Sequence, residues 1–165
     1  MMDIIAHARE VFANDRYATD TTGIMIEDCS VNHSLVSLKL DGRHRNAVGE
    51  VMGAVYYTLA DFAFAVASNY DRPMTVTLQS SISYMSSCRG DTLFAEADCT
   101  KEGGRTCFYD ITITDNMGNY VAKAQTTGYK MAPHFPAGSQ DADGDPYREQ
   151  IYLFEQAKKR ASEKQ

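Results

Sequence analysis

The stretch VMGAVYYTLADFAFAVAS, residues 51–68, constrains the fold more than any other part of this 165-residue chain. It has the length and continuity of a helix, its apolar residues run almost all the way round, and one carboxylate, Asp61, lies in its middle. A helix that is apolar on every side has to be enclosed on every side. We therefore expect a long buried helix on which Asp61 needs an explanation, because removing a carboxylate from water is costly.

The segments around this helix predict the elements that enclose it. Residues 2–14 have one apolar face at helical spacing, which predicts a short amphipathic helix. Residues 23–40 alternate with period two and predict a hairpin, or one strand bent near residues 28–32. Residues 74–131 alternate in four further segments joined by turn-forming residues, so four antiparallel strands follow the long helix.

Local signals predict where the long helix begins and how the next strand is oriented. Asn46 is a candidate N-cap, and Gly49 permits a tight approach to the helix that follows. The residue before Pro73 avoids the helical region, so the helix has to end before it. In the following strand the alternation predicts one apolar face, made of Val76, Leu78, Ile82 and Tyr84, and one polar face that includes Thr75 and Thr77.

These elements predict an α+β architecture in which an antiparallel sheet of five or six strands curls around one long helix. One sheet leaves a side of the helix uncovered, and the same helix or a sheet edge of a second copy would cover it in a two-fold dimer. We expect one domain over residues 1–131. A loop and a C-terminal helix would follow over residues 132–165, with a loose apolar stripe of Ile151, Leu153, Phe154 and Ala157.

Composition excludes several classes of protein. The formal net charge of −6 argues against binding to nucleic acid or to an anionic membrane, both of which need a basic surface. The N-terminus lacks the pattern of a signal peptide, and no apolar run is convincing as a membrane span. No CxxC spacing links the cysteines, so we expect reduced thiols in a cytoplasmic protein at Cys29, Cys88, Cys99 and Cys107.

The residues around the start of the long helix carry a resemblance to a known family. The chain reads HRNAVGEVMGA over residues 44–54 and LAD over residues 59–61. This is similar to the pattern H-x-N-x-x-G-x-x-H-G-G, followed by Leu-x-Asp, of hotdog-fold acyl-CoA thioesterases of the phenylacetate-pathway (PaaI-like) type. Residues 82–106 also resemble that family, and the resemblance covers about residues 20–131. Met52 and Ala54 depart from it, because the family usually has His and Gly there.

The resemblance implies a hotdog fold, a homodimer or homotetramer, and hydrolysis of an acyl-CoA thioester, with coenzyme A as part of the substrate and no other cofactor. Hydrolysis needs a group that polarises the carbonyl, and the unsatisfied N–H groups at a helix N-terminus suit that role. Gly53 lies in the first turn, where a missing side chain lets a carbonyl approach. The resemblance implies this role for Gly53, with Asn46 as a polar neighbour that orients the loop or the water.

A second group has to activate water or attack directly. A carboxylate in an apolar helix is desolvated, so we expect the pKa of Asp61 to be raised and its basicity with it. The matching Asp of the family serves as general base or nucleophile, and Thr77 matches a position whose hydroxyl holds the water. Because Gly53 and Asp61 are about 12 Å apart along one helix, one chain cannot easily bring both to one carbonyl. The resemblance implies a site shared between two copies.

The remaining candidates concern the substrate. Arg89, in the turn of residues 87–90, is a candidate contact for the CoA phosphates, and Arg72 and Arg105 are weaker ones. Aromatic residues at these spacings are more often core than pocket, but some could line a pocket for an aryl or medium-chain acyl group. The candidate substrate-binding residues are Met52, Ala54, Tyr57, Tyr84, Arg89 and Gly90.

Alternatives stay open at this level. Asp61 could be a buried acid satisfied by a hydroxyl, and His44 alone is more often structural. Methionine cannot donate a hydrogen bond, so a chain with Met52 could be a non-catalytic hotdog protein that binds acyl-CoA or a related apolar thioester. It could also be an interaction protein that uses its terminal helix. We expect no metal, because the calcium-like segment 141–145 has Pro146 and Tyr152 where Gly and Glu are required.

Overall fold

The computed structural model describes residues 4–70, 72, 74–131 and 156. The predicted C-terminal helix, the calcium-like segment and the second part of the predicted domain division all lie outside these residues, except for residue 156.

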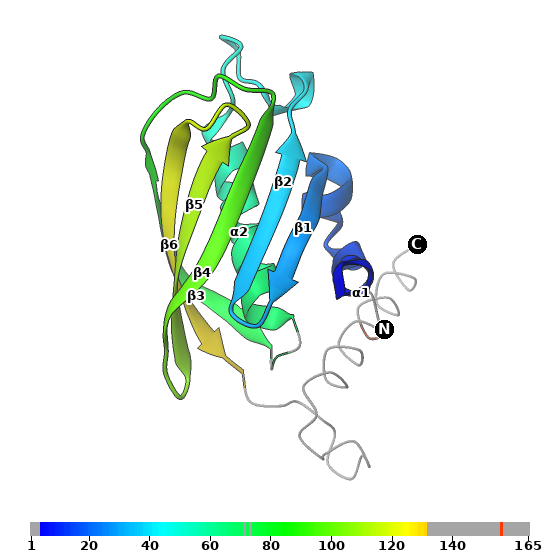
Figure 1. Ribbon diagram of the computed structural model, residues 1–165, viewed down its shortest axis with the longest axis vertical. Coiled ribbons are helices and arrows are strands. Elements are labelled where there is room, and N and C mark those ends of the chain that lie inside the picture. Colours follow the sequence, from blue (N-terminus) through cyan, green and yellow to red (C-terminus); the bar gives the residue numbers. More distant parts are fainter. Residues whose placement is uncertain (1–3, 71, 73, 132–155, 157–165) are drawn as a thin grey trace.

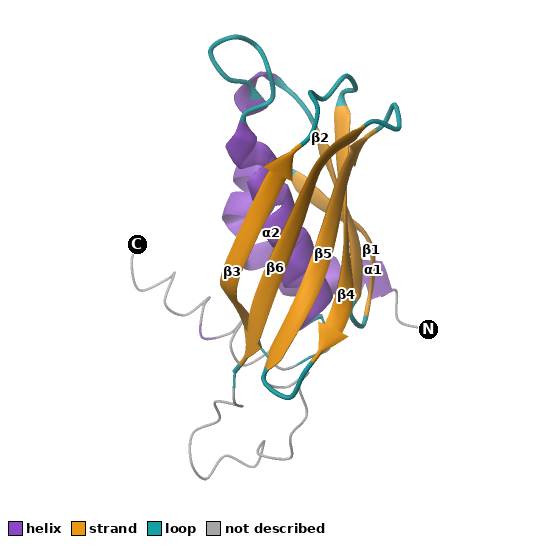
Figure 2. Cartoon of the chain, turned by 90° about the vertical axis from the view of Figure 1, so that its left-hand side faces the viewer, coloured by secondary structure: helices purple, strands orange, loops and turns teal. Residues whose placement is uncertain are grey.

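One six-stranded antiparallel sheet curls around one long helix, α2, as the alternation of the sequence predicts (Figures 1 and 2). The strands lie in the order β1-β2-β4-β5-β6-β3. Their bounds are β1 Ile24–Ser30, β2 His33–Lys39, β3 Thr75–Tyr84, β4 Thr92–Glu102, β5 Thr106–Asp115 and β6 Tyr120–Lys130. The helices are α1 Ile4–Val11, α2 Gly53–Asn69 and the short η1 Phe12–Asn14, η2 Tyr17–Thr22 and η3 Gly42–His44.

Helix α2 is the centre of the core. Ten of its seventeen residues are buried, and five of the strands supply buried apolar side chains around it, while β3 adds the partly buried Ile82. Its C-terminus is tied to the next strand, because Asn69 accepts a hydrogen bond from the backbone N–H of Thr75 at 2.7 Å and donates one to the Thr75 carbonyl at 3.2 Å. One stripe of the helix is left open by the chain itself, with Ala54, Tyr57 and Asp61 exposed at helical spacing.

The N-terminal segment covers one flank of α2. The rings of Phe12 and Phe62 meet edge to face with their centroids 5.9 Å apart. Arg9 of α1 donates two hydrogen bonds to the carbonyl of Ile26 on β1. The helix predicted for residues 2–14 is therefore α1 followed by the 3₁₀ turn η1.

The predicted N-cap is wrong. Met52 is the N-cap of α2, and its side chain makes no capping hydrogen bond. Asn46 organises the preceding loop instead, because its side-chain oxygen accepts from the N–H groups of Val48 at 3.0 Å and Glu50 at 3.1 Å. Gly49, with φ of 84°, completes this turn in a conformation that favours glycine.

The predicted face of β3 is also wrong at Leu78. A β-bulge lies between Thr77 and Gln79, so Leu78 falls outside the ladder and its side chain is 59% exposed. Before the bulge the predicted faces are reversed, because Thr75 is buried. Thr77 follows Thr75 by two residues, and no bulge lies between them. The two side chains therefore point to the same face of the sheet, the one that α2 covers.

The two ends of the sheet differ in what they carry. We call the end where α2 begins the upper end, which comprises residues 40–52, the loop 85–91 and the turn 116–119 (Figure 1). The lower end comprises the turns 31–32 and 103–105 and residues 70, 72 and 74. All four cysteines are free thiols. Within the described residues, no helix is long and apolar enough to cross a bilayer.

Candidate functional site

The N-terminus of α2 presents free hydrogen-bond donors. The N–H of Val55 donates to the carbonyl of Met52 at 2.9 Å, whereas those of Gly53 and Ala54 have no acceptor within the described part of the chain. The first N–H groups of a helix have no partner inside the helix and lie at its positive end. This end can therefore bind an oxygen that carries negative charge.

A cavity of about 400 Å³ lies beside this helix end. The phenol of Tyr84 donates a hydrogen bond to the carbonyl of Gly53 at 3.1 Å, and its ring meets Tyr56 edge to face at 6.0 Å. A Cβ at position 53 would lie 3.3 Å from the Tyr84 oxygen, so glycine keeps this approach open. The lining residues are Glu50, Val51, Gly53, Tyr56, Tyr84, Met85, Ser86 and Ser87.

Asp61 lies on the open stripe of α2, two turns beyond Gly53. Partial burial by its neighbours raises the pKa of this carboxyl, and the negative charge of Asp15 raises it further. The direction agrees with the prediction, but the side chain is exposed in the single chain rather than enclosed in the core. The eight residues between Gly53 and Asp61 span about 12 Å of helix, so the two groups do not meet within one protomer.

The other predicted site residues surround these two groups in part. Ala54 and Tyr57 share the open stripe with Asp61, and the side chain of Met52 is 53% exposed at the helix N-terminus. Thr77 is exposed on β3, on the α2 side of the sheet. Asn46 shapes the loop that leads into the helix.

Arg89 and Gly90 lie in the loop 85–91, which a buried carboxylate anchors. Asp115, only 3% exposed, accepts hydrogen bonds from the N–H groups of Arg89 at 2.9 Å and Gly90 at 3.1 Å, and further bonds from Asn119. Burial alone would raise the pKa of Asp115, but these hydrogen bonds outweigh it and hold the pKa well below its usual range. The loop is thus fixed while the Arg89 side chain stays exposed.

Arg72 and Arg105, the weaker phosphate candidates, lie at the lower end. Arg72 donates to Asn32 at 2.8 Å and is ion-paired with Glu102. Arg105 donates to the hydroxyl of Tyr129 at 3.4 Å. Neither residue adjoins the cavity at the start of α2.

His44 has a structural role. Its ring is buried, Nδ1 accepts from the N–H of Asp41 at 2.9 Å, and Nε2 is 2.8 Å from the carbonyl of Thr22. With Nδ1 accepting, the proton belongs on Nε2, which donates to Thr22. His44 therefore joins the loop before α2 to the end of η2.

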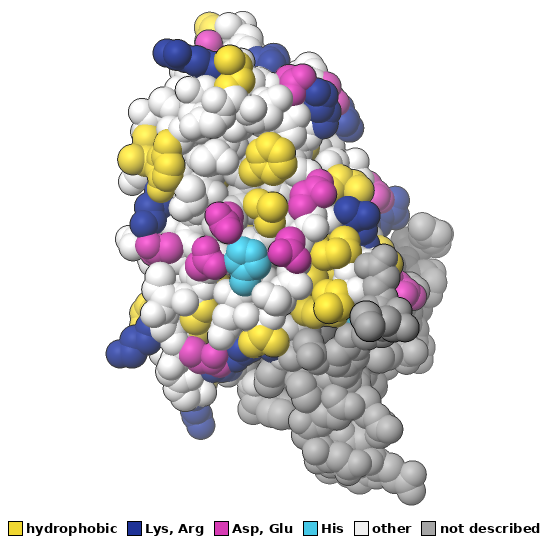
Figure 3. All heavy atoms as spheres, in the orientation of Figure 1, with side chains coloured by type: hydrophobic (Ala, Val, Ile, Leu, Met, Phe, Trp, Pro, Cys, Tyr) yellow, Lys and Arg dark blue, Asp and Glu magenta, His cyan; other side chains and the backbone are white. Residues whose placement is uncertain are grey.

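Metal-binding side chains come together on the outer face of the sheet, away from α2. The donor atoms of His33, Glu96 and Asp98 all lie within 4.8 Å of one another, and His33 Nδ1 is 2.8 Å from Asp98. Figure 3 shows a histidine among acidic side chains on this face. The hydrogen bond to Asp98 already satisfies one ring nitrogen of His33, and the group takes no part in the site at α2.

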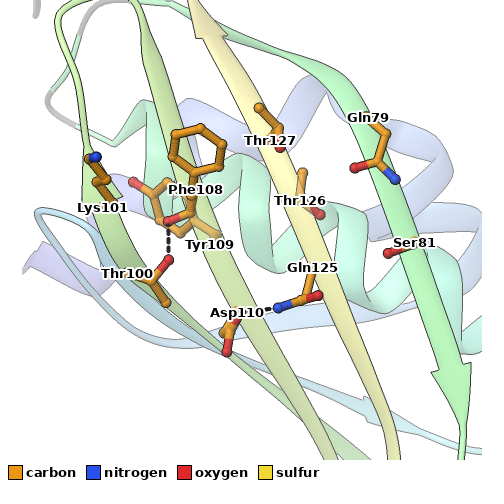
Figure 4. Close-up of a pocket in the computed structure, with 10 residues that line it drawn as sticks. All are labelled: Gln79, Ser81, Thr100, Lys101, Phe108, Tyr109, Asp110, Gln125, Thr126 and Thr127. Carbon is orange, nitrogen blue, oxygen red and sulfur yellow. Dashed lines mark hydrogen bonds between the residues drawn. The ribbon is translucent and has the colours of Figure 1, made fainter.

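A second hollow, of about 460 Å³, lies on the outer face across β3, β6, β5 and β4 (Figure 4). Its polar side chains satisfy one another in part. Gln125 donates to Asp110 at 3.1 Å, and Thr100 donates to the carbonyl of Phe108 at 3.1 Å. α2 lies on the other side of the sheet (Figure 4).

Sequence reasoning missed several residues of the upper end. Tyr56 is one of the aromatic residues whose spacing fits either core or pocket, and Ser86 and Ser87 carried no signal. Arg45 also went unnoticed, because it occupies a variable position between His44 and Asn46 of the family pattern. Only its contacts in the fold distinguish it from a solvated surface arginine.

Comparisons with known proteins agree with this architecture. The family model described as "Thioesterase superfamily" matches residues 48–122. A protein of Archaeoglobus fulgidus named "Putative esterase" is 31% identical over 108 residues, which are 65% of this chain and 70% of that protein.

Solved structures are similar as well. The E. coli PaaI protein from the phenylacetic acid degradation operon has a TM-score of 0.68 at 25% identity, over 78% of this chain and 96% of that one. A Streptococcus pneumoniae protein described as "Hypothetical Thioesterase Protein" and solved with coenzyme A has a TM-score of 0.65 at 26% identity, over 73% of this chain and 97% of that one. The smu.793 protein of Streptococcus mutans, bound to acetyl-CoA, has 0.63 at 30% identity, over 66% and 89%. The chain therefore belongs to the thioesterase superfamily and has its hotdog fold.

Proposed function

We propose that this protein hydrolyses an acyl-CoA thioester to the free acid and coenzyme A. The observation that carries the proposal is the open N-terminus of α2 beside a cavity of about 400 Å³. Family membership supports the reaction class. The two streptococcal structures, which hold acetyl-CoA and coenzyme A, support the substrate class.

The free N–H groups would stabilise the charge that develops during the reaction. The thioester oxygen accepts hydrogen bonds from Gly53 and Ala54, and water adds to the carbonyl carbon. The oxygen then bears a negative charge, which the positive end of α2 stabilises more strongly than the neutral carbonyl. Collapse of the intermediate breaks the carbon–sulfur bond and releases the CoA thiolate, which takes up a proton.

Asp61 would act as the general base that removes a proton from the attacking water. A raised pKa makes the carboxylate a stronger base, provided that it is ionised at the working pH. Thr77 would hold the water. Two mutant structures of a Streptococcus pneumoniae protein described as "Hypothetical Thioesterase Protein" have alanine in place of an Asp in one and of a Thr in the other. Those two positions are 16 residues apart, and Asp61 and Thr77 are also 16 residues apart.

The site would be shared between two copies. Asp61 and Gly53 do not meet in one chain, and the open stripe of α2 leaves Tyr57 and Asp61 exposed. Strand β3 is an edge of the sheet and exposes Leu78. A two-fold dimer that covers these features would bring Asp61 of one protomer opposite Gly53 of the partner subunit.

Met52 favours a second candidate, a protein that binds acyl-CoA without hydrolysing it. Its thioether offers no hydrogen-bond donor to a carbonyl, so the polarising groups left at this position are backbone N–H groups. The two candidates predict the same ligand but differ in turnover.

The test is release of free thiol from a panel of aryl- and acyl-CoA esters. We expect turnover of at least one ester, and we expect Asp61→Asn to lower kcat by about a hundredfold or more while the ester still binds. Asp110→Asn, on the outer face of the sheet, is the matched control and should leave kcat unchanged. Tight binding without thiol release from any ester would support the second candidate, and an unchanged kcat in Asp61→Asn would exclude Asp61 as the base.

A mixing experiment tests the shared site. Asp61→Asn and Gly53→Val homodimers should both be inactive, but a heterodimer of the two retains one site with both wild-type residues. The two variants are dissociated, mixed in equal amounts and reassociated, which should restore about a quarter of the wild-type activity. Half of the dimers then contain one chain of each variant, and half of the sites in those dimers are intact. No recovery, with mixed dimers demonstrated by mass spectrometry, would place both residues in one protomer's own site.

A further inference from the structure

The arginines of the described chain fall into two groups. Four of the seven form an ion pair with a carboxylate, namely Arg9, Arg16, Arg43 and Arg72. Arg45, Arg89 and Arg105 have no carboxylate partner among the described residues. Arg45 and Arg89 lie at the upper end, near the start of α2, whereas Arg105 lies at the lower end.

Arg45 is held at the rim of the site by its own loop. Its backbone forms an isolated β-bridge with Val51, which lines the cavity. Its guanidinium donates one hydrogen bond to the carbonyl of Gly49 at 2.9 Å, and the side chain is exposed. One donor nitrogen of the guanidinium is thus engaged by the loop, and the exposed side chain leaves the other donors available.

Arg45 also lies close to the loop that carries Arg89. Burial raises the pKa of the Cys88 thiol, and the positive charge of Arg45 acts in the opposite direction. Both loops line the cavity at the start of α2, because Val51, the bridge partner of Arg45, lines it together with Ser86 and Ser87. Because Asp115 anchors the backbone of Arg89, Arg45 and Arg89 belong to two fixed loops that border the same cavity.

The nearby carboxylates are largely engaged elsewhere. Asp41 pairs with Arg43, Asp91 pairs with Lys39, and Asp115 accepts backbone N–H groups. Neither arginine has a carboxylate ion-pair partner among the described residues, so their guanidinium groups stay available for an anion in a chain of net charge −6, although Glu50 lines the same cavity. Guanidinium groups bind phosphate through paired hydrogen bonds.

We infer that Arg45, together with Arg89, binds the phosphate groups of the coenzyme A part of the substrate. The inference rests on the proposed function and assigns a role to Arg45, which the family pattern leaves as a variable position. Arg45 acts in binding and not in the chemistry, because the phosphates are remote from the thioester. Its loss should therefore raise KM and leave kcat in place.

The experiment compares two substrates with the same acyl group, one on coenzyme A and one on pantetheine, which lacks the phosphates. Arg45→Ala should raise the KM for the CoA ester about tenfold, the effect of one lost charge-assisted hydrogen bond. It should leave kcat, and the KM for the pantetheine ester, unchanged. Arg105→Ala is the matched control, since Arg105 also lacks a carboxylate partner but lies at the lower end, and it should change neither KM.

Direct binding of coenzyme A separates this inference from the proposed function. Calorimetry should show about tenfold weaker binding of coenzyme A to Arg45→Ala than to the wild type, whether or not any ester is hydrolysed. Equal affinities, or an equal rise in KM for both esters, would overturn the role of Arg45. Absence of turnover with weakened binding in the variant would refute the hydrolysis and leave the phosphate contact standing.

Discussion

The lower and upper ends of the sheet treat polar groups in opposite ways. At the lower end, Glu102 receives hydrogen bonds from Arg72, Lys130 and Asn32, and Asn32 in turn accepts from the hydroxyl of Tyr109 at 2.7 Å. At the upper end, the N–H groups of Gly53 and Ala54 have no acceptor within the described chain, and Arg45 and Arg89 have no carboxylate partner there. The lower end closes the fold, whereas the upper end keeps donors and positive charge available for a ligand. This contrast supports the proposed site at the upper end.

The largest expected effect concerns the anchor of the upper end. Asp115→Asn places an amide where the carboxylate accepts several N–H groups, so at least one donor is left buried without an acceptor. We expect the free energy of unfolding to fall by about 3 kcal/mol, measured by urea denaturation at pH 7.

Asp110→Asn serves as the control for this variant. Asp110 is a carboxylate on the same strand, and its partner is Lys123 on the sheet surface. The expected loss there is below about 1 kcal/mol. Equal losses in the two variants would show that the hydrogen bonds to Asp115 stabilise the fold no more than those of the surface carboxylate Asp110.

A smaller effect is expected at the lower end. Hydrogen bonds from Lys130 and Asn32, with the charge of Arg72, lower the pKa of Glu102 to about 2. Glu102→Gln should therefore reduce the free energy of unfolding by about 1 kcal/mol at pH 7 without changing kcat or KM. Glu96→Gln, on the same strand, is the matched control.

The stabilisation from Glu102 should depend on pH in a direction that follows from its lowered pKa. The folded pKa lies below the unfolded one, so the stabilisation is present above about pH 4.3 and is lost as the pH falls toward about 2. The difference between wild type and Glu102→Gln should shrink over that window. A difference that stays constant down to pH 2 would mean that the charge of Glu102 does not matter.

The smallest effect concerns the pH profile of the site. Because the negative charge of Asp15 contributes to the raised pKa of Asp61, Asp15→Asn should move the acid limb of kcat/KM to lower pH while the plateau stays in place. Asp20→Asn is the control, since Asp20 is already paired with Arg16. An acid limb that moves equally in both variants would point to the net charge of the segment instead of the Asp15–Asp61 pair.

The spacing of apolar residues predicted helices and strands correctly where the regular pattern was unbroken. The apolar run of residues 51–68 gave α2, and the alternation of Ile24 and Ile26 gave a strand whose two isoleucines are buried. It failed at Leu78, because a bulge breaks the period and no residue there signals one. The N-cap prediction failed at Asn46 for another reason, because asparagine is favoured both in tight turns and at helix N-caps, and here it organises the turn.

The candidate site was predictable in its parts but not in its assembly. A helix start with Gly53 and a carboxylate at Asp61 follow from one segment. The contact of Tyr84 with Gly53 joins residues 31 positions apart, and no local pattern encodes it. The distinction between Arg45 and Arg43 is likewise invisible in the sequence, since it depends on which arginine has Asp41 as a partner.

The position of β3 in the sheet has a consequence for the way the chain folds. β3 is made directly after α2, yet its only neighbour in the sheet is β6, so Thr75 has to wait for Lys130, 55 residues later in the chain. Pairing over such a separation is slow, and until it happens the nascent strand exposes its edge. Until β6 is made, this segment is therefore the part of the sheet most open to pairing with another chain.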